Sequence, residues 1–166
     1  MMATLGKLAI STAVALVAGV ALAAPASAGP PATASGSFVE ISGGSTVTKA
    51  AGGNTFLSGF DTGVYTGGLS GTVHDVWTSV VHADGSFETK GTETCAVCTI
   101  GSQTGSFTAH WVFTGIFLPN GTGPTAGTLV FKSGTSGLAG IHGSGKFAGD
   151  AVAGTETYAF NYLFAP

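Results

Sequence analysis

Carboxylic acids inside apolar segments are the residues of this sequence best suited to chemistry. Asp75 lies between Val73 and Trp77, and Glu93 and Glu156 stand in segments where apolar and polar residues alternate. A carboxyl group that faces an apolar interior has a raised pKa, because burial disfavours its charged form, and it can then exchange a proton near neutral pH. The same acids would keep the protein soluble if they faced water, and the sequence leaves both interpretations open.

Tyrosine and histidine side chains complete the candidate catalytic residues. Tyr158 and Tyr162 follow Glu156 at even spacings, so in a strand they share its face. A phenol beside a buried carboxyl group can take part in proton transfer. His110 is a further candidate, because it lies in a long alternating segment and a neighbouring strand could bring a partner to it.

Metal and cofactor chemistry find little support in the sequence. The histidines show no pairing at two or four residues that would make a ligand pair, and we expect no bound metal. Gly140–Lys146 fits the first seven positions of a phosphate-binding loop, but Phe147 stands where a Ser or Thr binds magnesium, and no strand-to-helix context surrounds it. We therefore expect no nucleotide and no other cofactor.

Cys95 and Cys98 are the only cysteines. Their spacing is compatible with a redox motif, with half of a zinc site or with a plain disulfide. A redox site of the thioredoxin type places the first cysteine at a helix N-terminus, and a zinc site needs two further ligands at fixed spacing. We predict a structural disulfide, the default for a pair of cysteines in an exported protein.

Residues 1–28 have the pattern of a cleavable secretory signal peptide. Lys7 precedes an apolar run from Leu8 to Ala24, and Ala26-Ser27-Ala28 supplies the small residues that signal peptidase accepts. The most apolar stretch is shorter than the roughly 20 residues that span a bilayer. We expect a secreted or cell-envelope protein that has no membrane segment after cleavage.

The charge of the remaining chain excludes some partners. Without Lys7, four lysines and no arginine stand against eight acidic residues. Nucleic acids and anionic membrane surfaces are bound by clustered Lys and Arg, so we expect neither as a partner. The sequence leaves open whether the protein forms a homo-oligomer.

The elements that would position these residues are short strands. Residues 29–34 form a Pro/Ala/Thr tail that we expect to be disordered, and residues 35–166 form one domain. Runs rich in Val, Thr, Phe and Tyr alternate there with Gly, Asn and Asp clusters. The predicted strands are Ser35–Ser42, Ser45–Ala50, Thr55–Tyr65, Gly71–His82, Ser86–Cys95, Thr104–Leu118, Ala126–Lys132 and Ala153–Phe164.

The period of these runs favours an all-β fold with a single core. In Thr104–Leu118 and Ala153–Phe164 one face is aromatic and the other is small and mixed. Frequent glycines inside the runs permit the bulges and coiling that a small barrel needs. We predict a closed antiparallel β-barrel of about eight strands, and a β-sandwich is the alternative.

One segment resembles a known family signature. Residues 133–147 contain a Ser-Gly-Thr turn that runs into Leu-Ala-Gly, an aliphatic residue and then Gly-x-Gly-x-aromatic. This resembles a bacterial family of uncharacterised proteins, domain of unknown function 3224, whose members look like the allene oxide cyclase-like (dirigent-like) barrel group. Gly105-Ser106-Phe107 and Thr157–Tyr162 are similar to two further strands of that family. The likeness covers roughly Gly59 to Phe164.

Leu138 and Ile141 are the only large aliphatic residues between Phe131 and Phe147. We therefore expect the Leu138–Ile141 turn to plug into the barrel core and not to bind a ligand.

Two classes of function fit this sequence. The first is a non-enzymatic barrel that binds a small apolar ligand or serves as a structural module of the envelope. The second, an enzyme of the cyclase or isomerase type that acts on a hydrophobic substrate in the barrel, is implied only by the resemblance to the allene oxide cyclase barrel.

Overall fold

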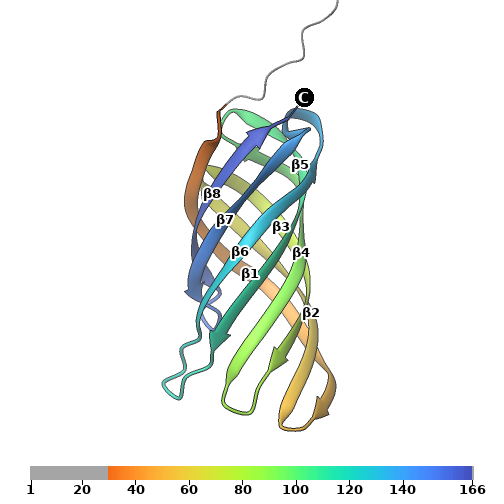
Figure 1. Ribbon diagram of the computed structural model, residues 1–166, viewed down its shortest axis with the longest axis vertical. Helices are drawn as coiled ribbons and strands as arrows, with labels where there is room; N and C mark the ends of the chain where they lie inside the picture. Colours follow the sequence, from red (N-terminus) through yellow and green to blue (C-terminus); the bar gives the residue numbers. More distant parts are fainter. Residues whose placement is uncertain (1–29, 166) are drawn as a thin grey trace, which may run out of the picture.

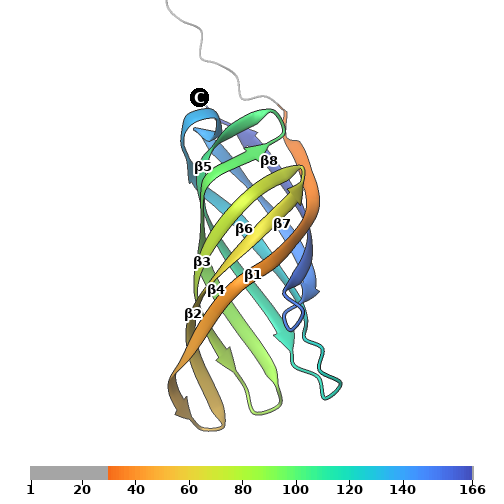
Figure 2. The ribbon, with the colours of Figure 1, turned by 180° about the vertical axis from the view of Figure 1, so that it is seen from behind.

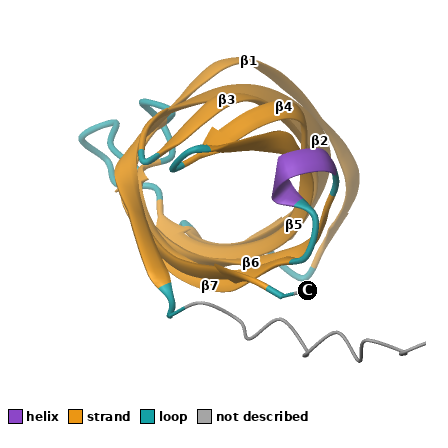
Figure 3. Ribbon diagram, turned by 90° about the horizontal axis from the view of Figure 1, so that it is seen from above, coloured by secondary structure: helices purple, strands orange, loops and turns teal. Residues whose placement is uncertain are grey.

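Eight antiparallel strands close into a barrel in the computed structural model, which describes residues 30–165. Each strand pairs with its neighbours along the chain, and the last strand returns to pair with the first (Figures 1 and 3). The elements are β1 (Ala32–Ala51), β2 (Asn54–Gly67), β3 (Leu69–Val81), β4 (Ser86–Ile100), β5 (Gln103–Ile116), β6 (Pro124–Gly134), the 3-10 turn η1 (Ser136–Leu138), β7 (Ile141–Asp150) and β8 (Thr155–Phe164).

The predicted signal peptide, residues 1–28, lies outside the described residues. Within residues 30–165, no helix is long and apolar enough to cross a membrane. The closed barrel of eight strands confirms the predicted fold class.

The predicted strands differ from the observed ones at most of their ends, and β4 continues to Ile100 instead of ending at Cys95. Two further differences concern β1. Ala32–Ala34, predicted as part of a disordered tail, pair with β8 and form the start of β1. The two segments predicted at Ser35–Ser42 and Ser45–Ala50 are one strand, because the glycine pair between them stays in the ladder, with Gly43 opposite Asp61 and Gly44 opposite Phe60. The nearby register shift falls just before this pair, between Glu40 and Ser42.

Strand β7 is absent from the prediction, which treated its glycine-rich sequence as a connection. Gly145 faces Phe160 across the β7–β8 ladder, and a Cβ at this glycine would overlap the Phe160 ring. The glycines that weakened the strand signal are therefore the residues that make room for the core.

The same pairing of glycine with a large aromatic residue places both tryptophans inside the barrel. Gly59 lies opposite Trp77, and Gly91 lies opposite Trp111. A Cβ on either glycine would overlap the indole of its partner. A small barrel can hold two indoles because the adjacent positions carry no side chain.

One half of the lumen is filled with apolar side chains, and we call it the plugged half. Its fully buried members include Leu69, Val73, Ile100, Leu138 and Ile141. The burial of Leu138 and Ile141 confirms that the Leu138–Ile141 turn is part of the core. Gly140 in this turn has φ +71° and lies against the backbone of Ala165.

The predicted disulfide is present in the plugged half. Cys95 and Cys98 are bonded to each other, and both are buried. The β4–β5 register shifts between these two residues, so the disulfide closes a bulge in β4.

Strand β1 extends beyond the part of the barrel that β8 closes. Only Ala32–Val39 pair with β8, whereas pairing with β2 continues to Ala51. In Figure 2 the β1–β2 hairpin therefore projects past the β7–β8 turn.

Candidate functional site

A row of three acids crosses the inner wall of the barrel. Asp61 on β2, Asp75 on β3 and Glu93 on β4 are direct cross-strand neighbours. Asp75 is 3 % exposed and Glu93 is 2 % exposed. Like charges directly opposite each other destabilise a sheet, so this acid row needs protonation or a partner of opposite charge.

Aromatic side chains hold the acid row through hydrogen bonds. The Trp77 indole N–H donates to Asp61 Oδ2 over 2.9 Å, and the Trp111 indole N–H donates to Asp75 Oδ1 over 2.6 Å. The Tyr65 hydroxyl donates to Glu93 Oε2 over 3.0 Å. The other oxygen of this carboxyl group, Glu93 Oε1, is buried and has no hydrogen-bond partner among the described residues.

Burial raises the pKa of every acid in this part of the lumen. The pKa of Asp75 rises to about 9, first through burial and then through the charges of Glu93 and Asp61. Burial raises the pKa of Glu93 to about 8 against the opposing hydrogen bond from Tyr65. The pKa of Glu156 rises to about 7 through burial and the charges of Asp61 and Glu40. At neutral pH, Asp75 and Glu93 are therefore mainly protonated.

A cavity of about 260 Å³ lies beside these acids and extends toward the β7–β8 turn. Glu40 and Glu156 line it together with the acid row, and Ser79 and Thr89 add hydroxyl groups. Aromatic rings supply much of the remaining wall, from Phe38, Tyr65, Trp77, Phe87, Trp111, Phe113, Phe117 and Phe147. We call this part of the lumen the acid half.

The structure brings three of the six predicted candidates to this cavity. Asp75, Glu93 and Glu156 all line it, as the interpretation with buried acids requires. Tyr158 lies inside the barrel, but its hydroxyl accepts a hydrogen bond from the Leu69 N–H over 2.8 Å and lies within hydrogen-bond distance of two carbonyl oxygens. Its role is to fasten β8 to the β2–β3 turn.

Tyr162 and His110 lie elsewhere. Tyr162 is buried beside Phe164 and does not line the cavity. His110 is exposed on the outer face of β5, because the neighbouring Ala109 and Trp111 face inward. Neither residue can contact a molecule in the cavity without a rearrangement of the barrel.

Several site residues were missed by sequence reasoning. Asp61 and Tyr65 were not recognised, although they lie on one face of β2 at even spacing, and Glu40 was not recognised either. Trp77 is two residues from Asp75, so period-two spacing could have placed both on the same face. The pairing of neighbouring strands, which puts Asp61 beside Asp75, carried no signal in the sequence.

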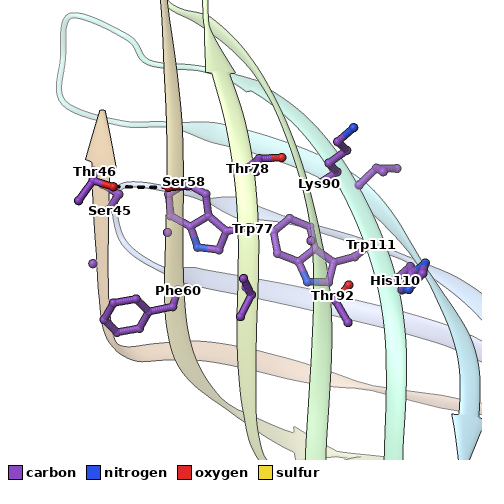
Figure 4. Close-up of a pocket in the computed structure, with 15 residues that line it drawn as sticks. Ser45, Thr46, Ser58, Phe60, Trp77, Thr78, Lys90, Thr92, His110 and Trp111 are labelled. Carbon is purple, nitrogen blue, oxygen red and sulfur yellow. Dashed lines mark hydrogen bonds between the residues drawn. The ribbon is translucent and has the colours of Figure 1, made fainter. Parts of the chain in front are cut away.

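A second hollow of about 930 Å³ lies on the outside of the barrel, over β1 to β5. Phe60 and Val76 are 63 % and 68 % exposed there and are cross-strand neighbours. Figure 4 shows His110 and Lys90 on the same surface. Trp77 and Trp111 line both this outer groove and the inner cavity, because the glycines beside them leave the indoles uncovered.

Within residues 30–165, no group of three or more His, Cys, Asp or Glu side chains has the arrangement of a metal site. The acid row therefore differs from a set of metal ligands in geometry, although its residue types are suitable.

Comparison with known proteins supports the fold. No protein-family model matches the sequence, and no curated protein is similar to it. The chain is similar to the crystal structure of a protein of unknown function from the DUF3224 family of Shewanella oneidensis MR-1. The two are 19 % identical, the match covers 82 % of this chain and 99 % of that one, and the TM-score is 0.61. The resemblance to this family is thereby confirmed at the level of the fold.

Proposed function

We propose that the protein binds a small molecule with an apolar body inside the acid half of its barrel. The observation that carries this proposal is the cavity of about 260 Å³, which has aromatic walls and ends on the acid row. Binding sites for small molecules combine a mainly apolar lining with a few polar groups that fix orientation. The rings would supply the apolar contact here, and Glu93 and Asp75 would orient the polar end of the ligand.

Tryptophan fluorescence tests this proposal directly, because the chain has two tryptophans and both line the cavity. The neutral probe N-phenylnaphthylamine should quench their emission in a saturable manner. Val81→Phe, which fills the inner cavity, should weaken the quenching, whereas Val76→Phe on the outer face should not. The opposite pattern would move the binding site to the outer groove.

An enzyme that transfers protons is the second candidate function. It is favoured by the hydrogen bond from Tyr65 to Glu93 and by the pKa of about 8 at this carboxyl group. A cyclase or isomerase acting on a hydrophobic substrate would use such a group as its base or acid.

A nitrobenzisoxazole probes this candidate without knowledge of the substrate. A carboxylate removes the ring C–H proton while the N–O bond breaks, and the product is a coloured phenolate. The rate should rise as Glu93 ionises, near pH 8, and Glu93→Gln should remove it. Glu88→Gln, on the outer face of the same strand, is the matched control. A rate that is equal in both variants would exclude Glu93 as a base.

We also propose that the protein is exported and cleaved after Ala28. The apolar run that follows Lys7 and the small residues at Ala26-Ser27-Ala28 support this. N-terminal sequencing of secreted material should begin within a few residues of Gly29, and exported protein that retains Met1 would contradict it.

A further inference from the structure

Five of the eight acidic side chains of this protein line one cavity. They are Glu40, Asp61, Asp75, Glu93 and Glu156. No lysine or histidine is among the residues that line the cavity, and Lys49, Lys90, Lys132 and Lys146 are exposed to solvent. Among the described residues, the negative charge that these acids can develop therefore has no cationic side chain to balance it.

Glu93 adds an independent sign that a partner is missing. Its Oε1 is buried without a hydrogen bond, and the side chain faces the cavity. A buried carboxyl oxygen without a partner costs free energy, and once Glu93 ionises this oxygen is an acceptor that needs a donor. Nearby donors of the protein are already used, since Tyr65 donates to the other oxygen and the two indoles donate to Asp61 and Asp75.

The walls of the cavity are also suited to positive charge. Trp111 and Phe113 stack with their ring centroids 5.0 Å apart, and Trp77 lies in the same wall. The faces of aromatic rings attract cations, and tryptophan does so most strongly.

We infer that the ligand of this cavity is a small organic cation, a protonated amine on an apolar or aromatic body, whose N–H groups bind the acid row. An ammonium group has three donors and no acceptor, and so matches three neighbouring carboxyl groups. One of its N–H groups supplies the donor that Glu93 Oε1 lacks. This inference rests on the proposed binding function and names the chemical class of its ligand.

The affinity for a cation should depend on pH in a way that the affinity for a neutral ligand does not. The ionisable groups facing the cavity are its five carboxyl groups and the Tyr65 phenol. The carboxyl groups are partly protonated at neutral pH. A bound ammonium group lowers their pKa, so binding releases protons to solvent. Aliphatic amines stay charged up to about pH 10, so affinity should rise from about pH 6 to about pH 9 as the carboxyl groups ionise.

The test compares three molecules of similar shape and different charge. Phenethylamine, phenethyl alcohol and phenylpropionate are titrated into the mature protein near pH 6 and near pH 9, with tryptophan emission and the melting temperature as readouts. At the higher pH the amine should bind about tenfold or more tighter than the alcohol, and this ratio should shrink at the lower pH. The anion should bind most weakly.

The outcomes separate this inference from the proposed function. If the alcohol binds as tightly as the amine at both pH values, the cation inference is wrong and lumen binding stands. If neither these molecules nor N-phenylnaphthylamine alters the emission, lumen binding itself fails. Calcium chloride is included as well, and a stabilisation by Ca²⁺ equal to that by the amine would overturn the choice of an organic cation.

Variants locate the effect. Glu93→Gln keeps the shape of the side chain and should bring amine and alcohol affinities within about threefold of each other, with alcohol binding retained. Glu88→Gln on the outer face of the same strand should leave the preference unchanged. Asp61→Asn repeats the test at a less buried position if Glu93→Gln fails to fold. A preference for the amine that survives both lumen substitutions would contradict the inference.

Discussion

The plugged half and the acid half of the lumen are built on the same strands, but one buries apolar side chains and the other buries carboxyl groups. Strand β4 shows the difference within three residues. Cys95 is buried among apolar residues and bonded to Cys98, whereas Glu93 is buried with one carboxyl oxygen unpartnered. The plugged half stabilises the fold by burying apolar surface, whereas the buried polar groups of the acid half lower the free energy of unfolding. Buried polar groups that destabilise the fold are typical of a functional site.

The largest expected effect comes from pH and acts on the acid half. The folded-state pKa values of Asp75, Glu93 and Glu156 are raised above their unfolded values, so the folded protein holds more protons between about pH 4 and pH 9. The stability that these protons contribute is therefore complete below about pH 4 and is lost as the pH rises through the folded pKa values. Thermal unfolding should show a loss of several kcal/mol across this range.

Asp75→Asn should flatten this pH dependence, because it removes the acid with the highest pKa in the row. Glu88→Gln should leave the dependence unchanged. Stability that rises between pH 5 and pH 9 would contradict the assignment of the acids to a buried site.

Leu138→Ala should have the next largest effect, and it acts on the plugged half. Leu138 is fully buried, so the truncation should cost about 3 kcal/mol of unfolding free energy at any pH. Lys146→Ala is the control, because Lys146 is exposed. An unchanged melting temperature for Leu138→Ala would show that the turn does not plug the barrel.

Gly91→Ala tests the packing of an indole within the acid half and should have a smaller effect. The added Cβ would overlap the Trp111 ring, so the variant should lose about 1–3 kcal/mol through overpacking and should change the tryptophan emission. At Gly44 an added Cβ meets the Phe60 ring at 3.5 Å, an ordinary contact, so Gly44→Ala is the matched control. Equal stability of the two variants would mean that the position of the Trp111 indole does not require a glycine at residue 91.

Replacing both cysteines by serine should have the smallest effect. The disulfide closes a loop of sequence separation 3, and so short a loop contributes less than the ~3 kcal/mol of a 15-residue loop. Ligand binding should be unaffected, since the disulfide lies in the plugged half. A large loss of binding would show that the two halves are coupled.

The sequence predicts the fold well where the period of two is clear. Strand β5 alternates through Phe107, Ala109 and Trp111, and these residues are buried. The period defines two faces but does not say which one faces inward, and for this reason His110 was a candidate until the structure placed it outside. In β7 the glycines obscured the period altogether.

The candidate site was predicted in part for a related reason. Burial of Asp75, Glu93 and Glu156 could be proposed from their apolar neighbours along the chain. That they lie beside Asp61 and Tyr65 depends on strand order and register, which are set by contacts between residues far apart in the sequence. Tyr158 was a reasonable candidate by residue type. The pairing of β8 with β1, which closes the barrel, puts its hydroxyl group against the backbone of the β2–β3 turn.

The projecting β1–β2 hairpin has a kinetic consequence for the acid half. Ser45 and Leu57 of this hairpin line the cavity, yet the β1 residues after Glu40 are hydrogen-bonded to β2 alone. The hairpin can therefore fray from its tip while the ring of eight strands stays closed. Ligand exchange should follow this local opening and not global unfolding. In hydrogen exchange, the amides of β1 beyond Glu40 that point away from β2 should exchange fast, and those bonded to β2 should exchange at the rate of fraying. The Glu40 N–H should stay protected, because it donates to the Gly154 carbonyl oxygen.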